Sequence, residues 1–478
     1  MTGPSLTFLI VLVVYFFVIL AIGVWGLRRT RTEDDFLTAS RTIGPWVGGA
    51  VLAATQISAG TFVGTVGRHY ATGVSWVWVW PGVWFGWLLS ALLVAPKLRE
   101  WGAVTIPDFL AARFESQAVR VVSALLIIFS YTILLTAQYQ ACGEIFQALF
   151  GLDPRVSMLI LMVSTLLYTM LGGVRSSSYI DFLQTLIMVA GVMVAIPLLL
   201  YQAGGLQIVG EYLTALDHRL TGWWYSGRQI LGFSLAFGLT MAAAPYEMVR
   251  FYSMRDKATV RYAIGVCILF QALIGAAVML IGLIMRMLFP HLSSPDQASS
   301  LMALHLLSPL AGSLFLVAMI SAIMSTVNSI LIVTAAGVSH DLYVSLINPH
   351  ASERRKLLLN RLSILLLGAL PIGFALERYT DVQSLVVVQT RFIASFFFVP
   401  IVMGLNWRRG TSASALGSMI GGFLGCLLWS LWGQDRFPDI DAVEIGIAAS
   451  ALLYVAMSRT KTGHRAGAEN GRKVEEQK

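Results

Sequence analysis

Apolar windows of about 20 residues, the length that crosses a bilayer as a helix, recur along almost the whole of this 478-residue chain. Hydrophobic residues make up 57% of the sequence and charged residues only 12%, whereas a soluble domain carries roughly 25% charged residues. Few residues lie outside these windows, so there is no room for a separate soluble domain of ordinary size. We therefore expect an all-α polytopic membrane protein.

The windows predict about 13 transmembrane helices. They begin near Leu6, Pro45, Val74, Val119, Val156, Ser178, Tyr225, Tyr262, Gly312, Leu362, Ser384, Ser412 and Ala442. The polar segment between Pro290 and Ala311 predicts an external loop with a short helix. We expect the first window, Leu6–Leu27, to be retained rather than cleaved, because no basic segment precedes it and basic residues follow it directly.

The net charge of +8 reflects topology rather than a nucleic-acid partner. Most of the basic residues fall in alternate loops and in the tail after Ser458. The positive-inside rule therefore predicts an amino terminus outside and a carboxyl terminus in the cytoplasm of a cell-membrane protein. The widely spaced cysteines at 142, 267 and 426 imply neither a disulfide framework nor a metal motif.

One stretch, Ala53–Gly64, is polar where apolar sequence flanks it on both sides. A helix that crosses lipid satisfies its backbone internally and has no need of such residues. Small polar residues and a glycine at this depth indicate a helix that breaks and offers its backbone to a ligand. The alternative is a helix that packs a face of small residues against a neighbour.

The predicted helices divide into two blocks of five, the second to sixth and the seventh to eleventh. An odd-numbered block repeated in tandem must be inverted in the membrane, as in many secondary transporters. The first helix of the second block, Tyr225–Val249, is also interrupted, by Gly232, Gly238 and Pro245. The resulting divisions are a first helix and cytoplasmic loop (1–42), two five-helix repeats (43–205 and 206–409), two peripheral helices (410–458) and a disordered cytoplasmic tail (459–478).

A second polar cluster lies at Ser321–Ser329. At helical spacing Ala322, Ser325 and Ser329 share one face, with Thr326 beside them. Hydroxyls and free carbonyls supply the hard oxygen ligands that a dehydrated cation such as sodium needs. The alternative is that the hydroxyls bond back to carbonyls one turn earlier.

Four motifs together carry a family resemblance. They are ISAGTFVG at 57–64 followed by Tyr70–Gly73, LGGVRSSSYIDFLQ at Leu171–Gln184, SAIMSTVNS at Ser321–Ser329, and MVRFYSMRDK at Met248–Lys257. From about Glu33 to Trp407 the chain resembles the sodium/solute symporter family, which includes proline, pantothenate and sialic-acid permeases and sodium/glucose cotransporters. The pantothenate-permease-like subgroup looks nearest.

The resemblance implies a leucine-transporter-type fold, a 5+5 inverted-repeat core with extra helices at either end. It also implies sodium-coupled symport of a small organic solute into the cell by alternating access. Pantothenate, a monocarboxylate and an amino acid are candidate solutes. The expected partners are that solute, the sodium ion as coupling ion and the lipid bilayer, with no nucleic acid and no obligate protein partner.

Carried over by position, the family's sodium site corresponds to the carbonyls of Ala54, Ile57 and Ala322 and the hydroxyls of Ser325 and Thr326. Asp181 falls in the family's acidic motif, which marks an exit path or, together with Asn328 and Ser329, a second sodium site. Asn328 departs from the hydroxyl type expected there. The alternative for Asp181 is an acid at a helix start, favoured by the macrodipole.

The candidate substrate residues lie in the broken helix and the spans around it. They are Thr55, Gln56, Ser58, Gly60, Thr61, Trp80, Trp84, Gln138, Gln140 and Arg391. Arg391 lies inside an apolar run, where a charge requires a partner. That partner is a substrate carboxylate, Glu144 or Glu247, unless the side chain extends to the external interface.

Three other functions are weighed against sodium symport. Proton-coupled symport is the nearest, because Asp181 would be able to carry a proton. A channel needs a continuous polar lining or a charged ring, which the paired broken helices do not supply. A membrane enzyme needs a constellation of His, Asp or Glu, and the seven histidines are scattered, so we predict no enzyme.

Overall fold

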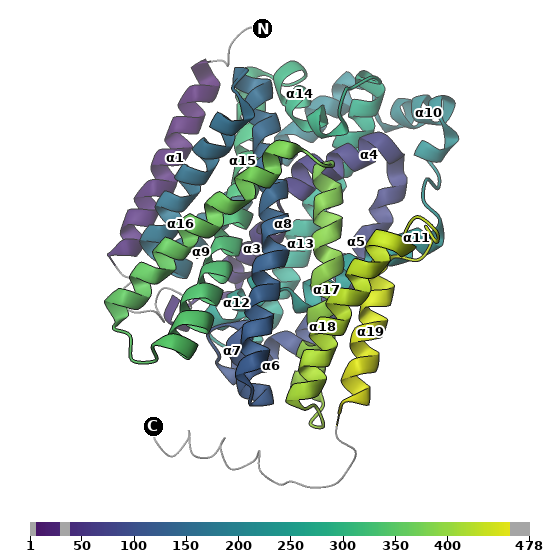
Figure 1. The fold of residues 1–478 in the computed structure, drawn as a ribbon. Coiled ribbons are helices and arrows are strands. Elements are labelled where there is room, and N and C mark those ends of the chain that lie inside the picture. The colour runs from purple at the N-terminus through teal and green to yellow at the C-terminus, as the bar shows by residue number, and fades with distance from the viewer. Residues whose placement is uncertain (1–5, 29–38, 459–478) are drawn as a thin grey trace.

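The computed structural model describes residues 6–28 and 39–458, with side chains except at 27, 40 and 167–173. The described chain is helical (Figure 1). The main helices of the bundle are α1 (Leu6–Leu27), α8 (Gln117–Phe150), α9 (Pro154–Gln202), α11 (Gly227–Ala243), α13 (Lys257–Leu288), α15 (Pro309–Ala336), α16 (Glu353–Glu377), α17 (Val382–Asn406), α18 (Ser412–Leu428) and α19 (Ala442–Ala456).

Shorter helices connect or extend these. The α-helical ones are α3 (Pro45–Gln56), α4 (Val66–Thr72), α5 (Val79–Leu89), α6 (Ala95–Trp101), α7 (Ile106–Phe114), α10 (Leu206–Leu216), α12 (Pro245–Ser253) and α14 (Ala298–His305). The 3₁₀ or π turns are η1 (Ala39–Arg41), η2 (Gly60–Thr65), η3 (Gly73–Trp78), η4 (Ser90–Val94), η5 (His218–Leu220), η6 (Pro295–Gln297), η7 (Gly337–Ile347) and η8 (Trp429–Gly433).

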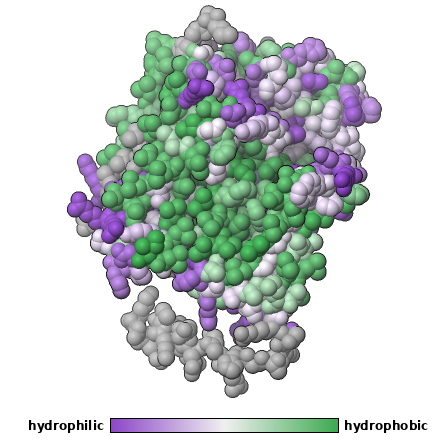
Figure 2. Space-filling model, viewed as in Figure 1, coloured by the Kyte–Doolittle hydropathy of each residue, from purple (hydrophilic) through white to green (hydrophobic). Residues whose placement is uncertain are grey.

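A broad hydrophobic belt covers the face of the molecule seen in Figure 2, and hydrophilic residues gather at its two ends. Among the described residues, 10 helices are long and apolar enough to cross a membrane. Three of the 13 predicted crossings lie outside that set, because Pro154–Leu166 and Ala442–Ala456 are short and the crossing at Pro45 is broken. The count of 13 is therefore not confirmed and stays a prediction.

The two ends of the described chain lie at opposite ends of the helix bundle. In Figure 1, α1 begins at the top and α19 finishes at the bottom. This arrangement requires an odd number of crossings. The expected short helix between 290 and 311 is present as α14, and the predicted disordered tail at 459–478 lies outside the described residues.

The first predicted break is present. Helix α3 ends at Gln56, and Ile57 has an extended backbone, with φ −72° and ψ 113°. Helical structure resumes at Gly60. Side chains satisfy the amides in the gap: the N–H of Ala59 donates to Gln138 Oε1 at 3.0 Å, and that of Gly60 to Ser58 Oγ at 3.1 Å.

The second break lies at Ala244, between α11 and α12, where φ is −73° and ψ is 120°. Pro245 causes it, because proline lacks an N–H and disfavours the helical conformation of the residue before it. The prediction that Gly232 and Gly238 interrupt this helix is wrong, since both lie inside α11. They are sites of close packing instead.

Helices α5 and α11 approach each other through glycines. A Cβ at Gly86 would lie 1.9 Å from the carbonyl oxygen of Gly238, and one at Gly238 would lie 2.4 Å from that of Gly82. Small residues spaced four apart, as Gly82 and Gly86 are, allow membrane helices to pack backbone against backbone. This contact fixes α11, the first half of the second broken helix, against α5, which follows the first break.

Gly86→Ala is therefore expected to lower the free energy of unfolding by about 1–3 kcal/mol, the range typical of overpacking. The measurement is thermal unfolding of the purified protein in detergent. Gly265→Ala is the matched control, because a Cβ at Gly265 meets nothing within 4 Å. Equal melting temperatures for the two variants would contradict the proposed tight contact.

Candidate functional site: an oxygen cluster and an adjoining pocket

Oxygen atoms from α15 and from the end of α3 converge at the first break. Ser325 Oγ lies 2.8 Å from the carbonyl oxygen of Ala54 and 3.0 Å from that of Ala322, so its one hydrogen is shared between them. Thr326 Oγ1 lies 3.0 Å from the carbonyl oxygen of Thr55, 3.2 Å from that of Ala322 and 3.5 Å from that of Ile57. Both hydroxyls bond within their own helix, as the alternative expected, and also reach across to α3.

The cluster has the chemistry and spacing of a cation site. Oxygens bound to a hard cation at about 2.3–2.6 Å stand roughly 3.2–3.7 Å apart at neighbouring corners of an octahedron. The hydroxyl-to-carbonyl distances here run from 2.8 to 3.5 Å, so a small expansion would admit an ion. The side chains of Ser325 and Thr326 are buried. The carbonyls at the end of α3 have no partner within their own helix, because α3 stops at Gln56.

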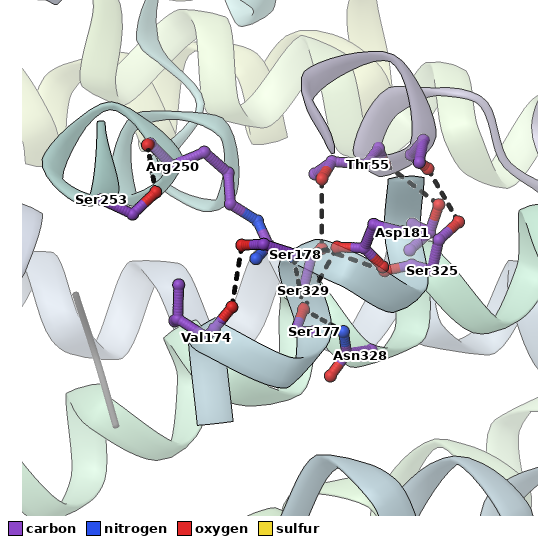
Figure 3. Close-up of polar contacts among 12 residues, drawn as sticks. Thr55, Val174, Ser177, Ser178, Asp181, Arg250, Ser253, Ser325, Asn328 and Ser329 are labelled. Atoms are coloured by element: carbon purple, nitrogen blue, oxygen red, sulfur yellow. Dashed lines mark hydrogen bonds and ion pairs between the residues drawn. The ribbon is translucent and has the colours of Figure 1, made fainter. Parts of the chain in front are cut away.

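A second polar cluster adjoins the first (Figure 3). Arg250 on α12 forms an ion pair with Asp181 on α9, with Nη2 and Oδ2 2.8 Å apart. Ser177 donates to the same oxygen of Asp181 at 3.1 Å. Asp181 lies well inside α9 rather than in the first turn of a helix, so the prediction of an acid at a helix start is wrong.

A pocket adjoins the same broken segment. It is lined by Gln56, Ser58, Gly60, Thr61, Thr65, Trp76, Val79, Trp80, Val83, Phe237, Gln383 and Val386. The lining has aromatic rings and neutral polar groups but no charged side chain. Gln383 is buried, and its Oε1 has no hydrogen-bond partner among the described residues, so an acceptor is available at the pocket wall.

An ion pair lies next to this pocket. Arg68 on α4 is 3.1 Å from Asp381, and its guanidinium lies 5.6 Å from the ring centre of the lining residue Trp76. Asp296 accepts the N–H of Val382 at 3.1 Å, at the first residue of α17. Burial raises the pKa of Asp296 to about 6. These contacts fix the start of α17 against α4 and η6.

A family model described as the Sodium:solute symporter family matches residues 36–422. The chain belongs to this family. It is a sodium-coupled symporter of a small solute, with Na⁺ as the coupling ion. It is also a multi-pass membrane protein.

The symporter is similar to several characterised relatives. It is 29% identical over 471 residues to the osmoregulated proline transporter OpuE of Bacillus subtilis, covering 95% of each chain. It is 28% identical over 441 residues to sodium/proline symporter 2 of Staphylococcus saprophyticus, covering 88% of this chain and 86% of the relative. These relatives do not favour the pantothenate-permease-like subgroup that the motifs suggested.

Solved structures share its fold. A sodium-coupled sialic acid symporter in a substrate-bound outward-open state superposes with a TM-score of 0.82 at 18% identity, covering 95% of this chain and 97% of the other. The nucleobase-cation-symport-1 family transporter Mhp1 superposes with a TM-score of 0.57 at 16% identity, covering 88% and 92%. The leucine-transporter-type fold is thereby confirmed.

Half of the predicted substrate residues line the pocket of this symporter: Gln56, Ser58, Gly60, Thr61 and Trp80. The others do not. The hydroxyl of Thr55 instead contacts that of Ser329 at 3.2 Å, Gln138 holds the gap in the broken helix, and Gln140 donates to the carbonyl of Thr380. Trp84 packs against Trp80 from outside the lining.

Arg391 also lies away from this pocket. Its guanidinium forms a two-point ion pair with Asp441, with Nε 2.8 Å and Nη2 2.5 Å from the two carboxylate oxygens. Neither of the two expected glutamates pairs with it: Glu144 pairs with Arg378, and the carboxylate oxygens of Glu247 have no hydrogen-bond partner among the described residues. Asp441 reaches Arg391 from the start of α19 instead. Thus the arginine joins α17 to the peripheral helix.

Sequence reasoning missed several residues. Thr65, Trp76, Phe237 and Gln383 line the pocket, and Arg250 and Ser177 belong to the cluster around Asp181. Arg250 lay in the MVRFYSMRDK motif and looked like a loop residue. It is only 2% exposed because α12 continues to Ser253, beyond the predicted helix end at Val249.

Arg391→Gln is expected to lower the free energy of unfolding by about 3 kcal/mol, because it leaves the buried carboxylate of Asp441 without its partner. Thermal unfolding in detergent measures this. Arg391→Gln combined with Asp441→Asn should lose less, since no charge is left unpaired. A change in the half-saturating sodium concentration, with stability unaltered, would instead place Arg391 in the transport site.

Proposed function

We propose that this symporter imports a small zwitterionic amino acid of the proline type together with sodium. The observation that carries the proposal is the contact between the two parts of the site. The oxygen cluster and the pocket share one broken segment, Thr55–Gly60, whose carbonyls face the cluster and whose Gln56 and Ser58 side chains line the pocket. An ion in the cluster therefore fixes the backbone that forms the pocket wall.

We propose that sodium binds the carbonyls of Ala54, Ile57 and Ala322 and the hydroxyls of Ser325 and Thr326. The carbonyl of Thr55 joins this set, because it lies closer to the hydroxyl of Thr326 than that of Ile57 does. All of these ligands are neutral, so the bound ion keeps its positive charge. That charge favours the carboxylate of a solute in the adjoining pocket.

The pocket suits a zwitterion better than a simple acid. Its lining has no fixed charge that would bind a carboxylate alone. The rings of Trp76, Trp80 and Phe237 provide apolar contact and faces that attract a primary or secondary ammonium group. The unpartnered oxygen of Gln383 would accept an N–H from that group. The names of the relatives, a proline transporter and a sodium/proline symporter, agree with such a solute.

Coupling follows from the broken helix. Sodium links α3 to α15 and stabilises the conformation in which the pocket is formed. Solute binds that conformation better than one in which α3 is free, and such a difference in affinity between states is what couples the two. We propose transport, rather than catalysis, as the activity of the chain.

We also propose that the amino terminus is outside a plasma membrane and the carboxyl terminus in the cytoplasm. The distribution of basic residues supports this orientation. The inverted repeats are proposed to span 43–205 and 206–409, each beginning with a broken helix. The flanking parts are the first helix with its loop, 1–42, the peripheral helices, 410–458, and the tail, 459–478.

Sodium-dependent uptake of radiolabelled proline into proteoliposomes, at fixed pH with and without sodium, tests the solute. We expect that other small neutral amino acids compete with proline for uptake and that pantothenate and monocarboxylates do not compete.

Gln383→Leu should raise the half-saturating solute concentration about tenfold, as the loss of a hydrogen bond to a charged group predicts. Gln389→Leu on the same helix is the control. Uptake driven by a proton gradient alone would contradict the proposal.

Ser325→Ala combined with Thr326→Ala tests the sodium site. Each lost oxygen removes a contact to a charge, worth roughly 1.5–3 kcal/mol, so the half-saturating sodium concentration should rise by tenfold or more. Thr334→Ala is the matched control, because its hydroxyl bonds carbonyls of its own helix. Normal transport by the double variant at low sodium would show that the ion binds elsewhere.

A further inference from the structure

The guanidinium of Arg250 lies inside the polar cluster beside the proposed sodium site. Its Nη2 atom is 2.8 Å from Asp181 Oδ2, 3.0 Å from Ser177 Oγ and 2.5 Å from Ser329 Oγ. The side chains of Arg250 and Asp181 are only 2% and 0% exposed. A positive charge on α12 is thus fixed between oxygens from α9 and α15 (Figure 3).

The hydroxyls in this cluster have no capacity left for a metal ion. A serine hydroxyl has one hydrogen to donate and two lone pairs to accept with. Ser177 donates to Asp181 and accepts from Arg250 and from Nδ2 of Asn328. Nη2 of Arg250 shares its two hydrogens among three oxygens, but the hydrogen and both lone pairs of Ser177 each have a partner within hydrogen-bond distance.

Ser329 is filled in the same way. It donates to the carbonyl of Ser325 at 2.9 Å, accepts from Arg250 and contacts the hydroxyl of Thr55 at 3.2 Å. Asp181 Oδ1 is the one carboxylate oxygen of Asp181 without a hydrogen-bond partner among the described residues. One oxygen is far fewer than the six or so that a hard cation takes.

Charge leads to the same conclusion. A buried carboxylate needs a compensating cation, and Arg250 supplies one that cannot dissociate. A sodium ion placed among Asp181, Ser177 and Ser329 would lie in direct contact with a like charge. Binding there would require the guanidinium to leave and the arginine to lose its own partner.

We propose that Arg250 is a tethered cation that takes the place of a second sodium ion, so that the symporter carries one sodium ion per solute molecule. The inference rests on the proposed sodium site at Ser325 and Thr326. It excludes Asp181, Asn328 and Ser329 as ligands of a transported ion and makes Arg250 the residue that sets the ion stoichiometry.

The test counts the sodium ions bound by the purified symporter at equilibrium, using radioactive sodium and no solute. Wild type is expected to bind one ion. Arg250→Met leaves Asp181 uncompensated and frees the hydroxyls, so the bound sodium should double. Arg250→Lys keeps the charge and should bind one ion. Arg250→Met combined with Asp181→Asn removes both charges and should also return to one.

Two further variants complete the design. Arg391→Met removes another ion-paired, partly buried arginine and should leave the count at one, and Ser325→Ala with Thr326→Ala should reduce it to none. Two ions on wild type would overturn the proposal, as would a single ion on a folded Arg250→Met protein. The wild-type count and the neutral double variant keep the test decisive even if Arg250→Met alone does not fold. Because no solute is present, a wrong assignment of the amino-acid substrate would not change these results.

Discussion

The backbone of a membrane helix has to be satisfied without water, and the rest of this site depends on how the chain meets that requirement at Ile57–Ala59. When α3 stops, its last carbonyls lose their partners. The hydroxyls of Ser325 and Thr326 on α15 contact those carbonyls, and the side-chain amide of Gln138 on α8 takes up a freed N–H. The break is therefore held in place by helices that are distant in sequence. At the proposed site an ion would replace the hydroxyl hydrogens at the same carbonyls, and sodium would thereby act directly on the geometry of the pocket wall.

Buried charges obey the same constraint, and three arginines are paired across helices. Arg250 joins α12 to α9 through Asp181, Arg391 joins α17 to α19 through Asp441, and Arg120 on α8 lies 3.4 Å from Asp341 in η7. A buried pair adds little net stability, but breaking one is costly. Such pairs therefore fix which helices neighbour each other. One of these pairs, Arg250 with Asp181, lies beside the proposed ion site, and the other two lie away from it.

The first break could be predicted from the sequence, because polar residues inside an apolar run are costly in lipid unless the helix breaks or binds a ligand there. The second break was predicted correctly at Pro245 but wrongly at Gly232 and Gly238, since glycines and a proline in one helix look alike as interruptions and only packing distinguishes them. Gly238 is required by contact with the backbone of Gly82, whereas Pro245 ends the helix. The proposed sodium ligands could be named because they lie on two short motifs. The pocket could not, because Trp76, Phe237 and Gln383 come from three separate segments and no local pattern joins them.

Arg391 and Arg250 also show that the partner of a buried or partly buried charge could not be predicted from the sequence. Arg391 stood out in the sequence because apolar residues surround it, yet its partner, Asp441, is 50 residues away in a peripheral helix. Arg250 looked like part of a basic loop, because Arg255 follows it closely and the helix end was misplaced. Burial depends on which helices pack together. A single sequence gives the cost of a buried charge but not the residue that offsets it.

Helix α15 is the common partner of both broken helices. Ser325 and Thr326 face α3, and one turn later Ser329 meets Arg250 on α12. In the proposed mechanism two cations contact neighbouring turns of α15, a sodium ion that can leave and a guanidinium that cannot. Without sodium, α3 keeps only the contacts of its carbonyls with Ser325 and Thr326, while α12 keeps its ion pair with α9. On this proposal only the sodium ion couples transport to the sodium gradient, and Arg250 holds the second broken helix in place.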